Sequence, residues 1–236
     1  MILRSFCIGL STFLSLIFFC TPDLLAQNKD FDPWADRDTP LGKKGTFGRV
    51  QFGGSFLNID DMNFALQNLD YEPLNNTYFA MGIGLSRMSG KVLLNADLYN
   101  YMIQESAYNN QLAVLSFHYL TTSIGYLAYR YENSLLIYPS IGLGAGITNL
   151  KVRALDEQYH TAYFSPGTLA DASLNIRRLN EIQDGKGYSY ELGLSLGYLH
   201  AIGDQFNFRK LVPDQTVSAS PSGFYFRFSF GLGKLK

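Results

Sequence analysis

The most regular hydrophobic pattern in the chain lies between residues 188 and 200, where side chains of two kinds alternate. One set of alternate positions holds Tyr188, Tyr190, Leu192, Leu194, Leu196, Tyr198 and His200, and the other holds Ser189, Glu191, Gly193, Ser195, Gly197 and Leu199. Successive side chains of a β-strand point to opposite faces, so this pattern predicts a strand. One face of that strand suits an apolar medium and has an aromatic residue near each end, while the other carries small and polar groups.

Six other segments show the same alternation: residues 46–58, 77–88, 91–103, 111–129, 134–152 and 223–235. Within residues 111–129 the apolar register changes, because Leu115 and Phe117 begin it and Ile124 and Tyr126 end it. That change of parity predicts a β-bulge near residues 119–120. Bacterial membrane barrels have even strand counts, so an eighth strand is expected. Its best candidate is residues 206–209, in a stretch that Pro213 interrupts.

The connections between these segments alternate between long and short: residues 59–76, 89–90, 105–110, 130–133, 153–186, 202–204 and 211–222. This alternation predicts an eight-stranded antiparallel transmembrane β-barrel, all-β in class, with short periplasmic turns and longer surface loops. In the first long loop, residues 61–69 have helical spacing and are interpreted as a short helix over the mouth of the barrel. In the long loop at 153–186, residues 169–179 are expected to form a turn or two of helix.

The alternative fold is a soluble β-protein whose apolar face packs on a second sheet, or a lipocalin-like barrel with the apolar face inside. The distribution of side-chain volume argues against both. The large apolar side chains fall on one face, and the other face is rich in glycine and serine, which cannot fill a core. In lipid the apolar face needs no protein partner, and closure of the barrel satisfies every backbone hydrogen-bonding group.

The N-terminus has the three parts of a secretory signal: a positive charge at Arg4, an apolar run at 5–19, and Leu24 and Ala26 before a cleavage point at Gln27. We therefore predict a signal peptide at 1–26, a polar periplasmic lead-in at 27–45 and the barrel at 46–236. An uncleaved membrane helix and a lipid anchor on Cys20 are the alternatives. The acids of the lead-in, Asp30, Asp32, Asp36 and Asp38, are interpreted as a solvated tail, since their spacing lacks the glycine and closing glutamate of a calcium loop.

Charged side chains on the inward face are the candidate site. Arg49, Asp97, Glu191 and Arg227 fall in the polar register, together with Gln51, Asn95, Tyr99 and Tyr225. Charges away from water are costly unless they are matched, so a neutral polar network filling a narrow lumen is the preferred interpretation. A gate or proton path through the same pairs is the sharper alternative. The many inward glycines either admit neighbouring side chains or leave a pocket for a hydrophobic ligand.

Catalysis is not expected from the motifs present. Neither a Gly-x-Ser-x-Gly elbow nor an HExxH pair occurs, and none of His118, His160 and His200 stands in a His-x-Ser arrangement. Both cysteines lie in the segment expected to be removed, so no thiol chemistry, metal site or cofactor is predicted. A net charge of −1 gives no electrostatic case for nucleic acid. A lipid-modifying enzyme acting through His160 is kept as an alternative.

The export signal, the aromatic and glycine-rich strands and the closing GFYFRFSFGLGKLK resemble the small outer-membrane β-barrel families common in Bacteroidetes-like bacteria. The resemblance covers residues 46–236 and is one of architecture, shared with OmpA-like and OmpW-like barrels, with no diagnostic motif. It implies a Gram-negative outer-membrane location, contact with outer-membrane lipid, and a structural or partner-binding role through surface loops that take a protein or a small ligand. A narrow, porin-like transporter for a small or hydrophobic solute is the alternative function.

Overall fold

A computed structural model of the chain describes residues 44–101, 104–108, 111–131, 134–154, 161–182, 187–202, 207–212, 215–218 and 220–235. The signal peptide predicted at 1–26, its two alternatives and the acidic lead-in up to residue 43 lie outside these residues. Among the described residues, no helix is long and apolar enough to span a membrane.

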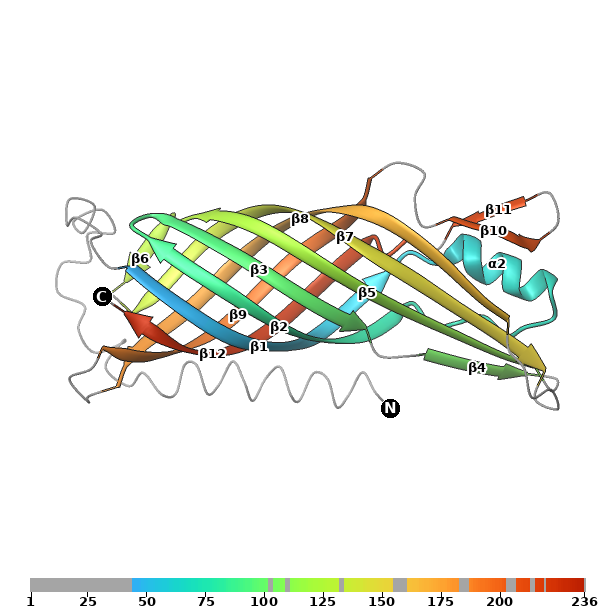
Figure 1. The fold of residues 1–236 in the computed structure, drawn as a ribbon, viewed down its shortest axis with the longest axis horizontal. Helices are drawn as coiled ribbons and strands as arrows, with labels where there is room; N and C mark the ends of the chain where they lie inside the picture. The colour runs from blue at the N-terminus through green and yellow to red at the C-terminus, as the bar shows by residue number, and fades with distance from the viewer. Residues whose placement is uncertain are drawn as a thin grey trace. The chain divides into compact units, whose positions relative to one another are not determined.

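The described chain forms a closed antiparallel barrel of eight long strands, coloured from blue to red along the chain in Figure 1. The strands are β1 (Lys44–Leu57), β2 (Thr77–Ser89), β3 (Val92–Tyr101), β5 (Gln111–Tyr126), β7 (Leu135–Ala154), β8 (Thr161–Glu181), β9 (Tyr188–Ala201) and β12 (Gly223–Leu235). Each pairs with its sequence neighbours, and β1 pairs with both β2 and β12. The barrel is therefore closed, and no long strand has a free edge along its whole length.

Smaller helical and strand elements lie at the two ends of the barrel. Helix α2 (Asp60–Asn68) lies between β1 and β2, β4 (Gln104–Tyr108) extends the sheet beside β5, and β6 (Tyr129–Tyr131) pairs with the start of β7. A separate hairpin, β10 (Asn207–Val212) and β11 (Gln215–Ser218), lies between β9 and β12. We call the end that bears α2 and this hairpin the α2 end. The opposite end, where β2 turns into β3 at residues 90–91 and where β1 begins and β12 ends, is the turn end.

The eighth barrel strand is β8, so the prediction that placed it near residues 206–209 is wrong. Residues 169–179, expected to be helical within a loop, lie in the middle of β8 and pair with both β7 and β9. Residues 207–212 and 215–218 instead pair as β10 and β11, in a sheet separate from the barrel. Because β8 adds one crossing, β9 runs from the turn end to the α2 end, opposite to the direction expected. Residue 202 consequently begins the connection that carries the hairpin, and residues 203–204 of the short turn predicted at 202–204 lie outside the described residues.

The predicted β-bulge in β5 is absent from the described structure. The register of β5 against β7 runs without a shift from Gln111, opposite Ala154, to Gly125, opposite Ser140. Leu115 and Phe117 therefore share the inward face with Tyr119, and both side chains are buried. Their apolar character reflects an apolar core inside this end of the barrel, and not contact with lipid.

The outward face is a continuous apolar belt, as predicted. Its exposed members include Phe52, Phe79, Met81, Ile83, Leu85, Leu98, Leu120, Ile124, Ile141, Leu143, Ile147, Leu196, Phe224 and Leu232. On β7 the belt ends sharply, because the outward positions after Ile147 are Asn149, Lys151 and Arg153. A soluble protein would bury side chains of this size, whereas this barrel presents them all around its wall.

We expect Ile141→Arg to hinder insertion of the barrel into lipid. Ile141 is 68% exposed in the belt, and an arginine on the lipid face costs about 2–4 kcal/mol at the midplane of the bilayer. Asn149→Arg is the matched control, since Asn149 has the same register on β7 beyond the last apolar position. Folding into phospholipid vesicles, followed by gel mobility without boiling, measures the effect. Equal yields of the two variants would mean that this face does not contact lipid.

Candidate functional site

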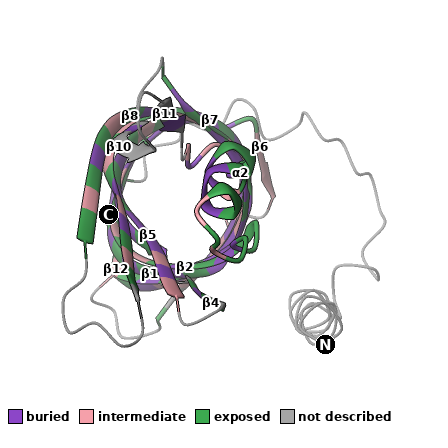
Figure 2. Cartoon of the chain, turned by 90° about the vertical axis from the view of Figure 1, so that its right-hand side faces the viewer, coloured by how far each residue is buried: buried purple, intermediate pink, exposed green. Residues whose placement is uncertain are grey.

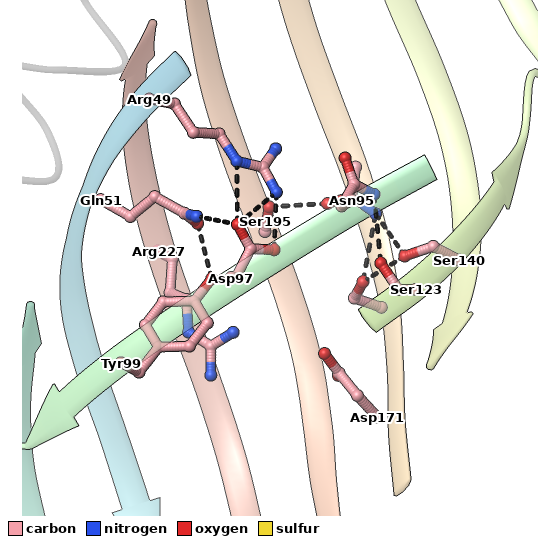
Figure 3. Close-up of polar contacts among 12 residues, drawn as sticks. Arg49, Gln51, Asn95, Asp97, Tyr99, Ser123, Ser140, Asp171, Ser195 and Arg227 are labelled. Atoms are coloured by element: carbon pink, nitrogen blue, oxygen red, sulfur yellow. Dashed lines mark hydrogen bonds and ion pairs between the residues drawn. The ribbon is translucent and has the colours of Figure 1, made fainter. Parts of the chain in front are cut away.

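The centre of the lumen is built around a buried ion pair between β1 and β3. Arg49 donates from Nη2 to both carboxylate oxygens of Asp97 at 2.7 and 2.6 Å, and from Nε at 3.1 Å (Figure 3). Gln51 adds a third donor to the same carboxylate at 2.6 Å, and its own Oε1 accepts from the Tyr99 hydroxyl at 2.6 Å. Two parallel bonds from a guanidinium are the strongest geometry for such a pair. Asp97 is thereby fully engaged in a region closed to solvent.

Glu191 belongs to a second cluster, formed with a residue that the sequence pattern did not single out. Arg177 on β8 contacts Glu191 Oε2 from Nη1 at 3.3 Å and donates from Nη2 to Asn95 Oδ1 at 2.8 Å. Asn95 in turn donates to Ser123 Oγ at 3.1 Å. Arg177 thus connects β8 to β9 and, across the lumen, to β3.

Arg227 is held mainly by aromatic rings. Its guanidinium lies 3.8 Å from the ring centre of Tyr99 and 3.5 Å from that of Tyr225, and Nη2 donates to the Tyr119 hydroxyl. Among the described residues Arg227 forms no ion pair with a carboxylate. The nearby acid, Asp171 on β8, accepts instead from the Tyr225 hydroxyl at 2.7 Å. Cation–π contacts of this kind stabilise a desolvated guanidinium.

Of the four residues proposed from sequence, Arg49, Asp97 and Arg227 are linked through Gln51 and Tyr99, whereas Glu191 belongs to a separate cluster. Arg49 and Asp97 pair with each other, Glu191 pairs with Arg177, and Arg227 is enclosed by tyrosines. We call the whole set the polar middle layer: Arg49, Gln51, Asn95, Asp97, Asp171, Asn175, Arg177, Glu191 and Arg227. It holds three arginines and three acids, so its formal charge is balanced.

The contribution of β8 extends to a small hydroxyl cluster around Asn175. The Asn175 amide donates to Ser140 and Ser173 at 2.9 and 3.1 Å, and its oxygen accepts from Ser195 at 2.7 Å. These contacts tie β7, β8 and β9 together on the inward face. Arg177, Asp171 and Asn175 were all missed for one reason, which is that β8 was taken for a surface loop.

The inward glycines make room for these side chains. A Cβ atom on Gly231 would lie 2.6 Å from Glu191 Cγ, and one on Gly197 would lie 2.5 Å from the Tyr225 ring. A Cβ on Gly84 would collide with the Asp97 carboxylate. At these positions the space that glycine leaves is occupied by a neighbouring strand's side chain, and not by a ligand pocket.

Apolar cores close the lumen on both sides of the polar middle layer. At the turn end Phe47, Met88, Leu93, Leu136 and Leu179 pack together with Leu127 and Tyr138. At the α2 end Tyr78, Tyr101, Leu115, Phe117, Leu150 and Leu199 form a larger core, which also includes Phe208 and Val217 of the hairpin. We call these the turn-end core and the α2-end core.

Helix α2 seals the second core as a cap, and Figure 2 shows it inside the ring of strands when the barrel is viewed from this end. Met62 and Leu66 point into the core and are fully buried. Asp60 and Asp61 occupy the first turn of the helix. Negative charges at this end interact favourably with the helix dipole. Asn63 fixes the returning segment by donating to the Leu74 carbonyl at 2.9 Å and accepting from its N–H at 2.8 Å. The short helix expected at 61–69 is therefore present, with bounds one residue earlier.

The histidines do not meet one another in the described barrel. His118 and His200 are exposed on the outer wall, on β5 and β9, and His160 lies outside the described residues. No cluster of three or more His, Cys, Asp or Glu suited to a metal ion occurs in the described part of the chain.

No protein-family model matches this sequence, and no curated protein matches it. Solved structures of small outer-membrane barrels are similar to it in fold. The attachment invasion locus protein Ail of Yersinia pestis, solved with the heparin analogue sucrose octasulfate, shares 10% identity over 83% of this chain and 99% of its own, with a TM-score of 0.41. Neisserial surface protein A shares 11% over 84% and 99%, with a TM-score of 0.42.

OprG of Pseudomonas aeruginosa, an outer-membrane protein, shares 10% identity over 84% of this chain and 97% of its own, with a TM-score of 0.31. Identities this low concern the fold alone. The narrower expectation of a Bacteroidetes-type barrel stays a prediction.

Proposed function

We propose that this chain is a non-enzymatic, non-conducting barrel of the outer membrane that binds a partner at its α2 end. The observation that carries the proposal is the filling of the lumen at three levels: the turn-end core, the polar middle layer and the α2-end core. Eight-stranded barrels leave an interior just wide enough for side chains. With the interior filled, the outer wall and the two ends of the barrel remain for function, and the α2 end carries the α2 cap.

The outer wall supports a membrane location. Outward positions are mostly apolar over the central part of the long strands, although Thr122 lies among them on β5. Aromatic residues lie near the limits of the belt, with Tyr126 and Tyr188 toward the turn end and Tyr198 against Phe224 toward the α2 end. Such girdles mark the two interfaces of membrane barrels. Beyond the belt on β7, the exposed Lys151 and Arg153 suit the phosphate groups of outer-membrane lipid.

The α2 cap supports binding of a polypeptide partner. Its outer face presents Phe64, 65% exposed, beside Asp60 and Asp61. The segment 58–76 adds Asp70 and Glu72 and contains no lysine or arginine. A large aromatic side chain on a rigid helix is a typical interface anchor, and the surrounding carboxylates favour a basic surface opposite. The partner we infer is therefore a protein or peptide with basic groups around an apolar pocket.

Site-specific photo-cross-linking in intact cells tests this function. A photoreactive phenylalanine analogue replaces Phe64 in one variant and Phe164 in another. Phe164 is the matched control, because it is also 65% exposed but lies on the outer wall at β8. We expect a discrete protein adduct from position 64 alone, and its loss when Asp60 and Asp61 are both changed to lysine. Lipid adducts alone, or the same protein adducts from both positions, would refute the proposed surface.

The two other functions considered from sequence make different demands. A narrow transporter needs a path through three packed layers, which the described residues do not provide. A lipid-modifying enzyme acting through His160 would alter lipid A or phospholipid on expression, and His160→Ala would abolish the change. Lipid analysis of cells expressing the native chain separates this activity from partner binding.

A further inference from the structure

Several buried polar atoms have no hydrogen-bond partner among the described residues, and two of them, Ser86 Oγ on β2 and Glu191 Oε1 on β9, belong to residues that line the same small cavity. Ser86 is 3% exposed and Glu191 is 1% exposed. The Arg177 guanidinium reaches only the other carboxylate oxygen of Glu191, Oε2. Buried polar atoms in native proteins are nearly always paired, and an unpaired one costs stability.

A small cavity lies beside both residues. Its volume is about 10 Å³, and its polar lining consists of Ser86, Arg177 and Glu191, while the rest is the apolar turn-end core. A buried water needs roughly 10–15 Å³ of such space and two to four polar partners. The cavity therefore has the size of a single water and is lined by the two residues that carry the unpaired oxygens.

We propose that one water molecule occupies this cavity and bridges Glu191 Oε1 to Ser86 Oγ. The water donates one hydrogen bond to Glu191 Oε1 and forms a second hydrogen bond with the Ser86 hydroxyl. Arg177 supplies a third polar neighbour. The apolar side chains around the site leave no room for a larger ligand.

This water has a structural consequence, because it connects strands that are not neighbours. β2 and β9 are separated in the barrel by β1 and β12. A bridge from Ser86 to Glu191 thus crosses the lumen just inside the turn-end core, as Arg177 crosses it toward Asn95. The site is independent of the partner proposed for the α2 end, and either can fail without the other.

Crystallography of the intact barrel, at a resolution that shows ordered waters, tests the proposal. We expect one isolated density within about 2.7–3.2 Å of both Ser86 Oγ and Glu191 Oε1. An empty cavity would overturn the proposal. So would a direct contact between the two oxygens, since the Ser86 hydroxyl would then donate to the Glu191 carboxylate without a water.

Two variants give an independent readout in solution. Ser86→Val fills the cavity with methyl groups. We expect it to expel the water and to raise the equilibrium constant for unfolding about tenfold or more, because Glu191 Oε1 then loses its hydrogen-bond partner. Glu191→Gln keeps an acceptor oxygen, and we expect it to retain the density. A Ser86→Val barrel as stable as the native one, or loss of the density in Glu191→Gln alone, would contradict a water held by both residues.

Discussion

Asp97→Ala is expected to destabilise the folded barrel by about 3–5 kcal/mol, because it leaves the Arg49 guanidinium buried without its carboxylate. The Arg49 and Asp97 side chains are 4% and 9% exposed, so water cannot replace the lost partner. The Gln51 amide loses its acceptor in the same variant, since it donates to Asp97 at 2.6 Å. Equilibrium unfolding by urea in phospholipid vesicles measures the change.

The double variant Arg49→Met with Asp97→Leu identifies the cause. Replacing a buried ion pair by apolar groups of similar volume is often neutral, so we expect the double variant to recover most of the stability that Asp97→Ala loses. If the double variant is as unstable as the single one, the cost arises from lost packing and not from an unpaired charge. A small effect of Asp97→Ala itself would mean that the centre of the lumen is hydrated.

Phe117→Ala is expected to cost about 3–5 kcal/mol, as for a large aromatic side chain removed from a packed core. Phe117 is 1% exposed, and its ring makes edge contacts with Tyr78 at 5.4 Å and Tyr101 at 5.8 Å between centres. The cavity left behind has no lipid beside it to fill the space. The same urea titration measures this loss.

Leu120→Ala, on the same strand, is the control for orientation. Leu120 is 51% exposed on the outer wall. Lipid chains fill the space that its side chain leaves, so we expect only a transfer cost of about 1–2 kcal/mol. If Leu120→Ala proves the more damaging of the two, Phe117 faces lipid, and the β-bulge expected from the sequence exists after all.

Seven of the eight barrel strands were predictable because lipid imposes a simple rule on them. In the belt, outward positions must be apolar and inward positions are small or polar, and β12 follows this rule over Phe224, Arg227 and Phe230. The rule fails where the interior is itself apolar. On β5, Leu115 and Phe117 are apolar because they face inward and pack in the α2-end core. Ile124 is apolar because it faces outward.

β8 was not predicted as a strand for the same physical reason, which is that part of the barrel interior is apolar. The effect is larger on β8 than on β5. Its inward positions include Leu169 and Leu179, which enter the two apolar cores, while its outward positions include the small Ala170 and Ala172. The contrast between faces is therefore nearly lost. Pro166 lies within β8 and pairs only with β7, since β9 ends opposite Leu169. A proline is tolerated where one edge is free.

The candidate site residues were predictable where their strand was predicted, and they were missed where it was not. The inward positions of Arg49, Asp97, Glu191 and Arg227 followed from alternation alone. Their partners did not, because alternation gives the face of a side chain but not its height or its neighbours across the lumen. Arg177 and Asp171 became visible only with the placement of β8. The enclosure of Arg227 by Tyr99, Tyr119 and Tyr225 depends on the placement of three strands, β3, β5 and β12.

The conductance of the purified barrel in planar lipid bilayers tests the closed lumen most directly. With two apolar cores and a polar middle layer in series, we expect no discrete conductance steps from the native chain at either polarity. We also expect no conductance steps after removal of residues 60–69, because the polar middle layer and the turn-end core remain in place without the α2 cap. Reproducible steps from the native chain would contradict a filled lumen and would establish the barrel as a channel.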